Sequence, residues 1–451
     1  MSTASSSASS EQPPGTSSAR AAETDGPGND GVVGRRAVQR WLASRVTWVA
    51  ILLAVAAGCI MASSYIGGLV NPVGNQHDAP IGVVNLDAGA SAEGQDVDAG
   101  DELQQKLTST ETHMFDWQVL DSRDEAERRL RNNTLWGAIV IPESFSSDIV
   151  DIGASAGDAD QAGLVVLTNE GGGSYPTAVF QDLYQEVVDE ASQDTARMLA
   201  NQLDQAGETV SPDAAAVLGQ PVVSDVHAVV ELPDRSGRGI APFYLTIIAT
   251  LTGFMAANVI SIGTDFMRGR THLEMMGRII PLKRASGRPG SAWVFKVVGT
   301  VLGAALGGAA AVFTAHGLVG MDLDAVAKTY GWAMLSAATI GVVTLVFLAV
   351  FGLLGQLLGV LFTTIFGVPS ALAIYPEQAL PGFFQFISGW HPMRYISDGM
   401  RSVAFYDGSG AGLGKALDMM LIWLVAALVV GSLVAWWSDR RHPLSRESAT
   451  R

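Results

Sequence analysis

The sequence predicts a polytopic α-helical membrane protein with six transmembrane helices and an α/β extracytoplasmic domain inserted between helices one and two. Three observations lead to this fold class. Apolar residues make up 48% of the 451 residues and charged residues only 16%. The apolar residues gather in runs of about 20, which is the length that crosses a bilayer core. Acidic residues concentrate in one long stretch after the first of these runs.

The N-terminal residues 1–34 are rich in Ser, Ala and Gly. They cannot bury enough apolar surface to offset the entropy lost on ordering, so we expect a disordered cytoplasmic tail. Residues 35–66 follow as a basic segment and the first transmembrane helix, at about 46–66. The basic segment is either a short interfacial helix or simply a flank that anchors the span, and both interpretations remain open. The length and position of the span favour an uncleaved helix over a signal peptide.

Residues 67–240 form the predicted extracytoplasmic domain. They contain 30 acidic and 8 basic residues, a formal charge of −22, whereas the whole chain carries −16. This charge argues against nucleic acid as a partner, because binding to phosphates needs a basic surface. The single cysteine, Cys59, lies in the first apolar run. The domain therefore has no disulfide and must depend on its apolar core.

Strand and helix signals alternate along this domain, which is typical of an α/β fold. The order of the strands cannot be read from the sequence. We expect strands at 81–86, 115–120, 135–141 and 164–167, helices near 101–108, 124–130 and 176–205, and an extended return to the membrane at 222–232.

The remaining apolar runs make residues 241–437 a five-helix transmembrane domain, with spans at about 243–263, 292–316, 332–354, 357–375 and 417–437. The 265–290 loop, the N-terminal flank and the C-terminal tail 438–451 are all basic. Because basic residues favour the cytoplasmic side, we expect a multi-pass protein of the cell membrane with both termini in the cytoplasm.

The loop between the second and third spans is longer and more basic than a simple connection needs. It is either a positive-inside anchor or a docking surface for a cytoplasmic partner. The candidate docking residues are Arg268, Arg270, Glu274, Arg278, Lys283 and Arg284.

Two further features concern the membrane region. Segment 381–406 is aromatic and amphipathic but too polar to cross a bilayer, so we expect a re-entrant or interfacial element on the external face; its motif residues are His391, Pro392, Tyr395, Asp398 and Arg401. The third span places Gly299, Gly303 and Gly307 on one helical face. Small residues at this spacing predict close helix packing, within the chain or between protomers.

No catalytic, cofactor-binding or metal site is predicted. Segment 408–416 superficially resembles a phosphate-binding loop, but Ser409 stands where glycine is required and Ala416 where Ser or Thr is required. Asp265, Lys296 and Asp418 lie at or near span ends, which disfavours proton antiport.

The acidic stretch 96–102 resembles a calcium loop at its first two ligands only. Glycine stands where the third ligand belongs, so a solvated acidic loop is favoured over a divalent-cation site.

Three stretches resemble the type-2 ABC exporter permeases, and most of all their YhgE/Pip-like (phage infection protein-like) branch. They are Gly-Val-Val-Asn-Leu-Asp-x-Gly at 82–89, Trp-Gly-Ala-Ile-Val-Ile-Pro-Glu-Ser-Phe-Ser at 136–146, and Trp-His-Pro-Met-Arg-Tyr-Ile-Ser-Asp-Gly-Met-Arg at 390–401. In the last stretch His391 replaces the asparagine that often precedes the proline.

The resemblance implies a homodimer of six-helix units in membrane lipid, with a separate cytoplasmic ABC ATPase docking around 268–288. The first functional hypothesis is therefore a non-enzymatic permease subunit of an exporter that moves an amphiphilic or lipid-like substrate outward. The alternative is a membrane-anchored scaffold, receptor or secretion-system component whose acidic domain binds an extracytoplasmic protein partner.

Overall fold

The computed structural model describes the chain from residue 44 to residue 441 with short gaps. The predicted tail 1–34, residues 35–43 of the basic segment and residues 442–451 of the predicted tail 438–451 lie outside the described residues. The chain divides into two compact units, 1–59 and 60–451. Helix α2 (Arg45–Gly67) is 23 residues long and apolar, which is sufficient to cross a bilayer core. The described ranges are 44–67, 71–92, 95–109, 113–155, 159–206, 212–268, 274–275, 278–279, 289–372 and 375–441.

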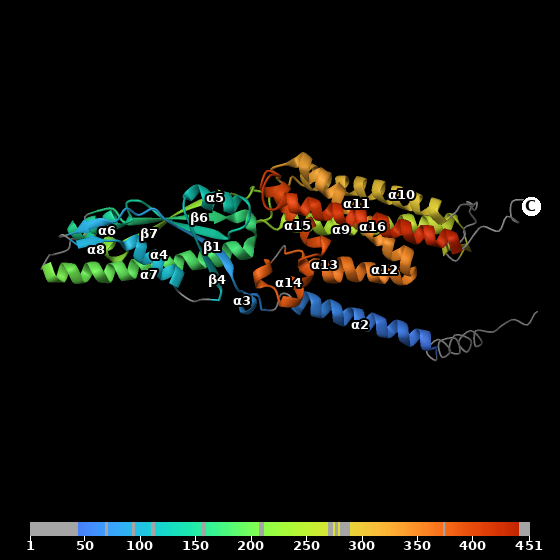
Figure 1. Ribbon diagram of the computed structural model, residues 1–451, viewed down its shortest axis with the longest axis horizontal. Helices are drawn as coiled ribbons and strands as arrows, with labels where there is room; N and C mark the ends of the chain where they lie inside the picture. The colour runs from blue at the N-terminus through green and yellow to red at the C-terminus, as the bar shows by residue number, and fades with distance from the viewer. Residues whose placement is uncertain are drawn as a thin grey trace, which may run out of the picture. The chain divides into compact units, whose positions relative to one another are not determined.

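An α/β region follows α2 in the chain. Its sheet has five strands in the order β4-β1-β5-β6-β7 (Figure 1). Strand β1 pairs in parallel with β4 and β5, β6 runs antiparallel to β5, and β7 is parallel to β6. The strands are β1 (Ala79–Asn85), β4 (Phe115–Leu120), β5 (Gly137–Ile141), β6 (Ala162–Asn169) and β7 (Val222–Val230).

Helices and a short hairpin surround this sheet. The predicted helices at 101–108, 124–130 and 176–205 correspond to α4, α5 and α7, and the predicted extended return at 222–232 is the edge strand β7. These elements are α3 (Pro72–Asn75), β2 (Ala90–Ala92), β3 (Gln95–Val97), α4 (Ala99–Ser109), α5 (Arg123–Arg131), α6 (Phe145–Ala154), η1 (Glu170–Gly172), α7 (Ser174–Ala206) and α8 (Pro212–Gly219).

The apolar core lies on both faces of the sheet, because successive strand residues point to opposite faces. On one face Ile139 and Ile141 pack with Phe180 of α7. On the other face Val140 packs with Leu130 of α5. Gly137 at the start of β5 is required by this packing, since a Cβ there would lie 2.0 Å from the Phe180 ring.

Asp87, just after β1, caps two helices at once. Its carboxylate accepts hydrogen bonds from the backbone amide of Gly100 at 3.1 Å and from that of Ser146 at 2.9 Å. It also accepts from the Ser146 hydroxyl. Both amides lie in the first turn of a helix, α4 or α6, where backbone donors have no partner within the helix. A single carboxylate thus fixes α4 and α6 against the sheet.

Substituting Asp87→Ala should destabilise the first turns of α4 and α6, because each lost helix cap costs about 1 kcal/mol. Each loss corresponds to roughly fivefold faster hydrogen exchange through local opening of the helix concerned. We expect this acceleration in peptides covering 99–109 and 145–154 of the full-length protein. Asp121→Ala, at an exposed aspartate after β4, is the matched control. Unchanged exchange in Asp87→Ala would refute the double-cap role.

Beyond α2, four helices among the described residues are long and apolar enough to cross a membrane: Ala241–Met267, Gly290–Leu318, Val326–Phe351 and Leu413–Arg440. They correspond to α9 (Ala241–Met267), α10 (Pro289–Val312) with the π-helical turn η2 (Phe313–Leu318), α11 (Val326–Phe351) and α16 (Leu413–Arg441).

The predicted span at 357–375 is a shorter apolar helix, Leu354–Ser370. It is built from α12 (Leu353–Val360), the π-helical turn η3 (Leu361–Phe366) and α13 (Gly367–Ser370). Gly352, with a φ of 60°, ends α11. Because α11 ends at this left-handed residue, the boundary between the two helices lies earlier in the chain than the apolar pattern predicts.

Small residues allow the long helices to approach closely. Gly299, Gly303 and Gly307 of α10 lie against Ile260, Ala256 and Thr252 of α9, in that order. Gly253 of α9 in turn meets the α11 backbone, where an added Cβ would lie 2.1 Å from the Ala337 carbonyl oxygen. Such contacts favour association where the hydrophobic effect between helices is weak.

A partly buried ion pair joins α9 to α10. Lys296 Nζ lies 2.9 Å from Asp265 Oδ2 and also donates to Ser261 Oγ at 2.9 Å. Lys296 lies two turns inside α10, yet its charge is compensated by a partner on the neighbouring helix. The pairing explains how a bundle of apolar helices accommodates these two charges.

Candidate functional site

Helix α15 (Pro392–Phe405) carries the predicted motif and has two chemically different faces. Arg394, Asp398 and Arg401 recur at intervals of four and three residues, so they form a polar stripe along one side. On the other side Ile396 and Met400 are fully buried in the core of the helical bundle. The helix therefore packs on one face and presents charge on the other.

His391 sets the start of α15. Its Nδ1 accepts a hydrogen bond from the Met393 amide at 3.2 Å, and its Nε2 lies 3.1 Å from the Phe362 carbonyl oxygen. These two bonds require a neutral ring with the proton on Nε2. Burial accordingly lowers the pKa of His391 to about 4. His391 thus performs the capping role for which asparagine is favoured, and Pro392 fits the first helical position.

Close contacts with α11 hold α15 in place. Trp332 Nε1 donates to the Ile396 carbonyl at 2.9 Å. A Cβ at Gly399 would lie 2.0 Å from the Trp332 ring, so only glycine allows this approach. The backbone amide of Ala325 also donates to the Val403 carbonyl at 3.2 Å. The glycine of the Asp-Gly-x-Arg pattern is therefore a packing requirement.

The charged stripe forms a local network. Arg394 pairs with Glu377 at 2.8 Å and with Asp398 at 3.6 Å. Burial raises the pKa of Asp398, while the charges of Arg394 and Arg401 oppose this rise. Arg401 is itself buried and donates to the Leu372 carbonyl at 3.4 Å. The network holds the stripe in a fixed geometry.

Tyr406, just beyond α15, connects this helix to the α/β region. Its buried hydroxyl donates to Asn169 Oδ1 at 2.8 Å, and Asn169 Nδ2 donates to Asn133 Oδ1 at 3.0 Å. Burial raises the pKa of the Tyr406 phenol, which therefore remains protonated as the donor. Close by, a Cβ at Gly410 would lie 2.3 Å from the Arg131 carbonyl oxygen. We call these contacts the Tyr406 latch: Tyr406, Asn169, Asn133 and the approach of Gly410 to Arg131.

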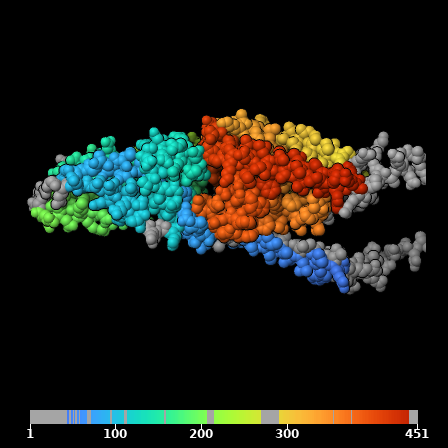
Figure 2. Space-filling model, in the orientation of Figure 1, coloured from blue at the N-terminus to red at the C-terminus, as the bar shows by residue number. Residues whose placement is uncertain are grey.

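The α/β region and the C-terminal third of the chain are in direct contact (Figure 2). At this junction the charged stripe faces a cavity of about 400 Å³, a volume within the range of small-molecule sites. One wall comes from the helical region and the other from the α/β region. The residues that carry its polar and aromatic groups are Asn132, Asn133, Thr134, Trp136, Glu377, Gln378, Arg394, Tyr395, Asp398, Arg401 and Lys415.

The five motif residues of 381–406 have two different roles in the structure. Asp398, Arg401 and Tyr395 line the cavity, while His391 and Pro392 organise the helix start. Three of the candidate docking residues are described. Arg268 is the C-cap residue of α9. The backbone of Glu274 and Arg278 lies in a two-stranded hairpin formed by β8 (Glu274–Met275) and β9 (Arg278–Ile279). Arg270, Lys283 and Arg284 lie outside the described residues.

Sequence reasoning missed the partners contributed by the α/β region. Asn133 and Asn169 belong to no motif that the sequence singled out, and their only signal is their position just after α5 and at the end of β6. Glu377, the partner of Arg394, likewise belongs to none of those motifs. Within the described part of the chain, no group of three or more His, Cys, Asp or Glu side chains is arranged to hold a metal ion.

Comparison with known proteins gives two partial similarities. The chain is 33% identical over 78 residues to the "Uncharacterized protein YhgE" of Bacillus subtilis (strain 168), a match covering 17% of this chain and only 10% of that protein. A crystal structure of "a domain of a putative ABC type-2 transporter from Thermotoga maritima MSB8" has 19% identity and a TM-score of 0.22. It covers 33% of this chain and 86% of that chain.

The family comparison is far more extensive. The model of the family described as "ABC-2 family transporter protein" matches residues 45–437, which include α2, the whole α/β region, α15 and the bundle. The chain therefore belongs to the ABC-2 family of transporter proteins.

Proposed function

We propose that this protein is the permease subunit of an exporter that moves an amphiphilic or lipid-like molecule outward, driven by a separate cytoplasmic ATPase. The observation that carries the proposal is the charged stripe of α15, which faces the junction cavity while the opposite face packs in the bundle. A polar headgroup can bind to such a stripe, and an apolar tail can remain along the bundle. Membership of the ABC-2 family supports transport as the process.

The proposed arrangement has six spans: α2, α9, α10, α11, the shorter helix Leu354–Ser370 and α16. Both termini and the 265–290 loop then lie in the cytoplasm, and residues 67–240 lie outside. In this arrangement the acidic α/β region is extracytoplasmic and two copies of the chain form the working unit. The concentration of basic residues in the 265–290 loop supports this orientation.

The ATPase is proposed to dock on the 265–290 loop. Reversing Arg268, Arg270 and Arg278 to glutamate should abolish its retention, because the reversal replaces three positive charges on the docking surface with negative ones. The measurement is affinity purification of the tagged protein after crosslinking, with mass spectrometry of retained proteins. Reversing Arg123, Arg128 and Arg197, exposed arginines of the α/β region, makes the same charge change and should leave retention intact.

Two outcomes contradict the proposed docking. If no ATPase is retained with the unaltered protein while envelope proteins are, the scaffold alternative replaces the permease. If both triple variants lose the ATPase equally, the loop is not its docking site.

The orientation can be tested with single cysteines, because Cys59 is the chain's only one. In a Cys59→Ala background, Ser224→Cys in β7 should react with a membrane-impermeant maleimide on intact cells. Ser286→Cys in the 265–290 loop should react only after permeabilisation. The opposite labelling pattern would invert the proposed topology.

The role of the cavity can be tested at Arg401. Arg401→Gln should lower export of the cargo by about tenfold or more, since a hydrogen bond to a charged group contributes about 1.5–3 kcal/mol. Arg401→Lys should retain part of the activity because it keeps the charge. The measurement compares the small molecules released by cells carrying each variant with those released by cells lacking the protein.

Arg238→Gln is the control for this experiment, because Arg238 is an exposed cation that does not line the cavity. Normal amounts of each variant in the membrane show that it has folded. Full export by Arg401→Gln would remove the cavity from the transport path.

A further inference from the structure

A second cavity lies within the α/β region and shares no lining residue with the junction cavity. It is a groove of about 430 Å³ between α4, α6 and α7, which is within the range of small-molecule sites. Its lining is divided between apolar side chains and charged ones. The lining residues that the argument uses are Asp96, Asp98, Glu102, Leu103, Lys106, Phe145, Ile149, Asp194 and Met198.

The apolar part forms the walls of the groove. Leu103, Phe145 and Ile149 are buried members of the sheet core, so their positions are fixed by packing. Met198 of α7 is 46% exposed beside them, and its flexible thioether can adapt to a ligand. These walls suit an alkyl or aromatic group, for which burial of each methylene contributes about 0.8 kcal/mol.

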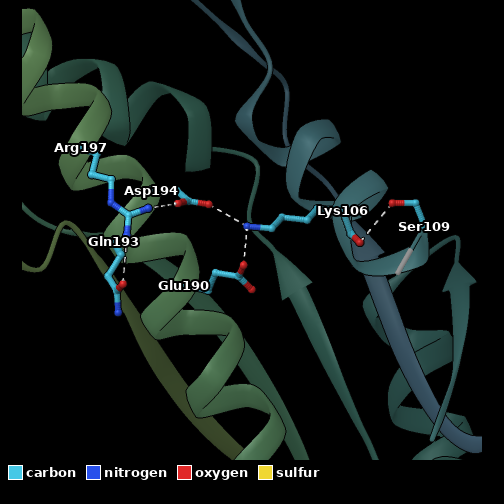
Figure 3. Close-up of polar contacts among 6 residues, drawn as sticks. All are labelled: Lys106, Ser109, Glu190, Gln193, Asp194 and Arg197. Atoms are coloured by element: carbon cyan, nitrogen blue, oxygen red, sulfur yellow. Dashed lines mark hydrogen bonds and ion pairs between the residues drawn. The ribbon is translucent and has the colours of Figure 1, made fainter. Parts of the chain in front are cut away.

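The charged part already holds one ammonium group. Lys106 extends from α4 toward α7, where its Nζ lies 2.7 Å from Asp194 Oδ2 and 2.9 Å from Glu190 Oε1 (Figure 3). These hydrogen bonds raise the pKa of Lys106, which keeps its ammonium charged. Arg197 pairs with the other oxygen of Asp194 at 2.9 Å. The groove thus contains an alkylammonium bound by two carboxylates.

The rest of the rim carries further carboxylates, and no Lys or Arg side chain among the described residues forms an ion pair with them. Asp98 lies directly before α4, and Glu102 and Lys106 follow on α4 at intervals of four residues. Asp96 precedes all three. The ion pairs among the described residues involve neither Asp96, Asp98 nor Glu102. Asp98 is exposed, and the charge of Asp101, followed by desolvation and the charges of Asp87 and Asp96, raises the pKa of Asp98. Asp96, Asp98 and Glu102 therefore give this part of the rim a negative charge.

We propose that this groove binds a small cationic amphiphile, an amine or quaternary ammonium with an alkyl or aromatic body. The carboxylates of Asp98 and Glu102 contact the cation, while Leu103, Phe145, Ile149 and Met198 contact the apolar body. Charge complementarity selects the sign of the ligand, and the size of the groove selects a small molecule over a protein surface. The inference does not depend on an ATPase or on transport, because it concerns binding to the α/β region alone.

The probe is octyltrimethylammonium, measured by titration calorimetry with full-length protein in phosphatidylcholine nanodiscs. Empty nanodiscs correct for partition into lipid. We expect saturable binding at one site per chain. Hexyltrimethylammonium should bind roughly 15-fold more weakly, about fourfold for each lost methylene. Octyl sulfate and octyl glucoside, which share the chain but lack the positive charge, should bind at least tenfold more weakly.

The decisive variant is Asp98→Asn with Glu102→Gln, which removes two rim charges and leaves the apolar walls intact. It should weaken octyltrimethylammonium binding about tenfold at low salt, and salt should weaken binding to the unaltered protein more than to this variant. Asp182→Asn with Glu186→Gln, at exposed positions of α7 outside the groove, makes the same charge change and should have no effect. Circular dichroism establishes that both variants are folded.

Three results would overturn the proposal. Equal binding of octyl sulfate would exclude selection by charge. Equal loss of affinity in the Asp182/Glu186 variant would show a general electrostatic effect. Binding of a lysine-rich peptide without binding of octyltrimethylammonium would assign the groove to a protein partner instead.

Discussion

The division of α15 into a buried apolar face and a charged face is the constraint on which the rest of the candidate site depends. Trp332 and Gly399 bring this helix so close to α11 that its rotation is fixed. Once the rotation is fixed, Arg394, Asp398 and Arg401 must face away from the bundle core. Charges in that position need partners or water, and the network with Glu377 together with the junction cavity satisfies both needs.

The sequence predicted the parts of this fold that depend on local patterns. Apolar runs located the long helices, and alternating strand and helix signals located most elements of the α/β region. The glycines at 299, 303 and 307 predicted a close helix contact, and the partner helix is α9. The short fifth apolar helix was placed less well, because its boundary depends on the left-handed backbone of Gly352 and no apolar pattern records a backbone angle.

What the sequence could not provide was pairing between distant segments. Asn133, Asn169 and Tyr406 form a latch only after the sheet order β4-β1-β5-β6-β7 brings the ends of α5 and β6 to α15. The motif stretches at 82–89 and 136–146 illustrate the same point. They read as separate signatures, yet Asp87 and Ser146 meet in one hydrogen-bonded node that caps two helices. The node accounts for Asp87 in the first stretch and for Ser146 in the second.

Helix α9 connects the two regions along the chain. At one end it follows β7 through a short segment in which the Glu170 carboxylate accepts a hydrogen bond from the Leu232 amide. The Arg235 amide in the same segment donates to the Asp322 carboxylate at 3.3 Å, and the Asp322 amide donates to the Arg235 carbonyl oxygen at 3.4 Å. At the other end Asp265 joins it to Lys296 of α10, beside the basic loop. Helix α9 and the short segment before it therefore connect the basic loop to the edge strand β7, the neighbour of β6, whose Asn169 accepts a hydrogen bond from Tyr406.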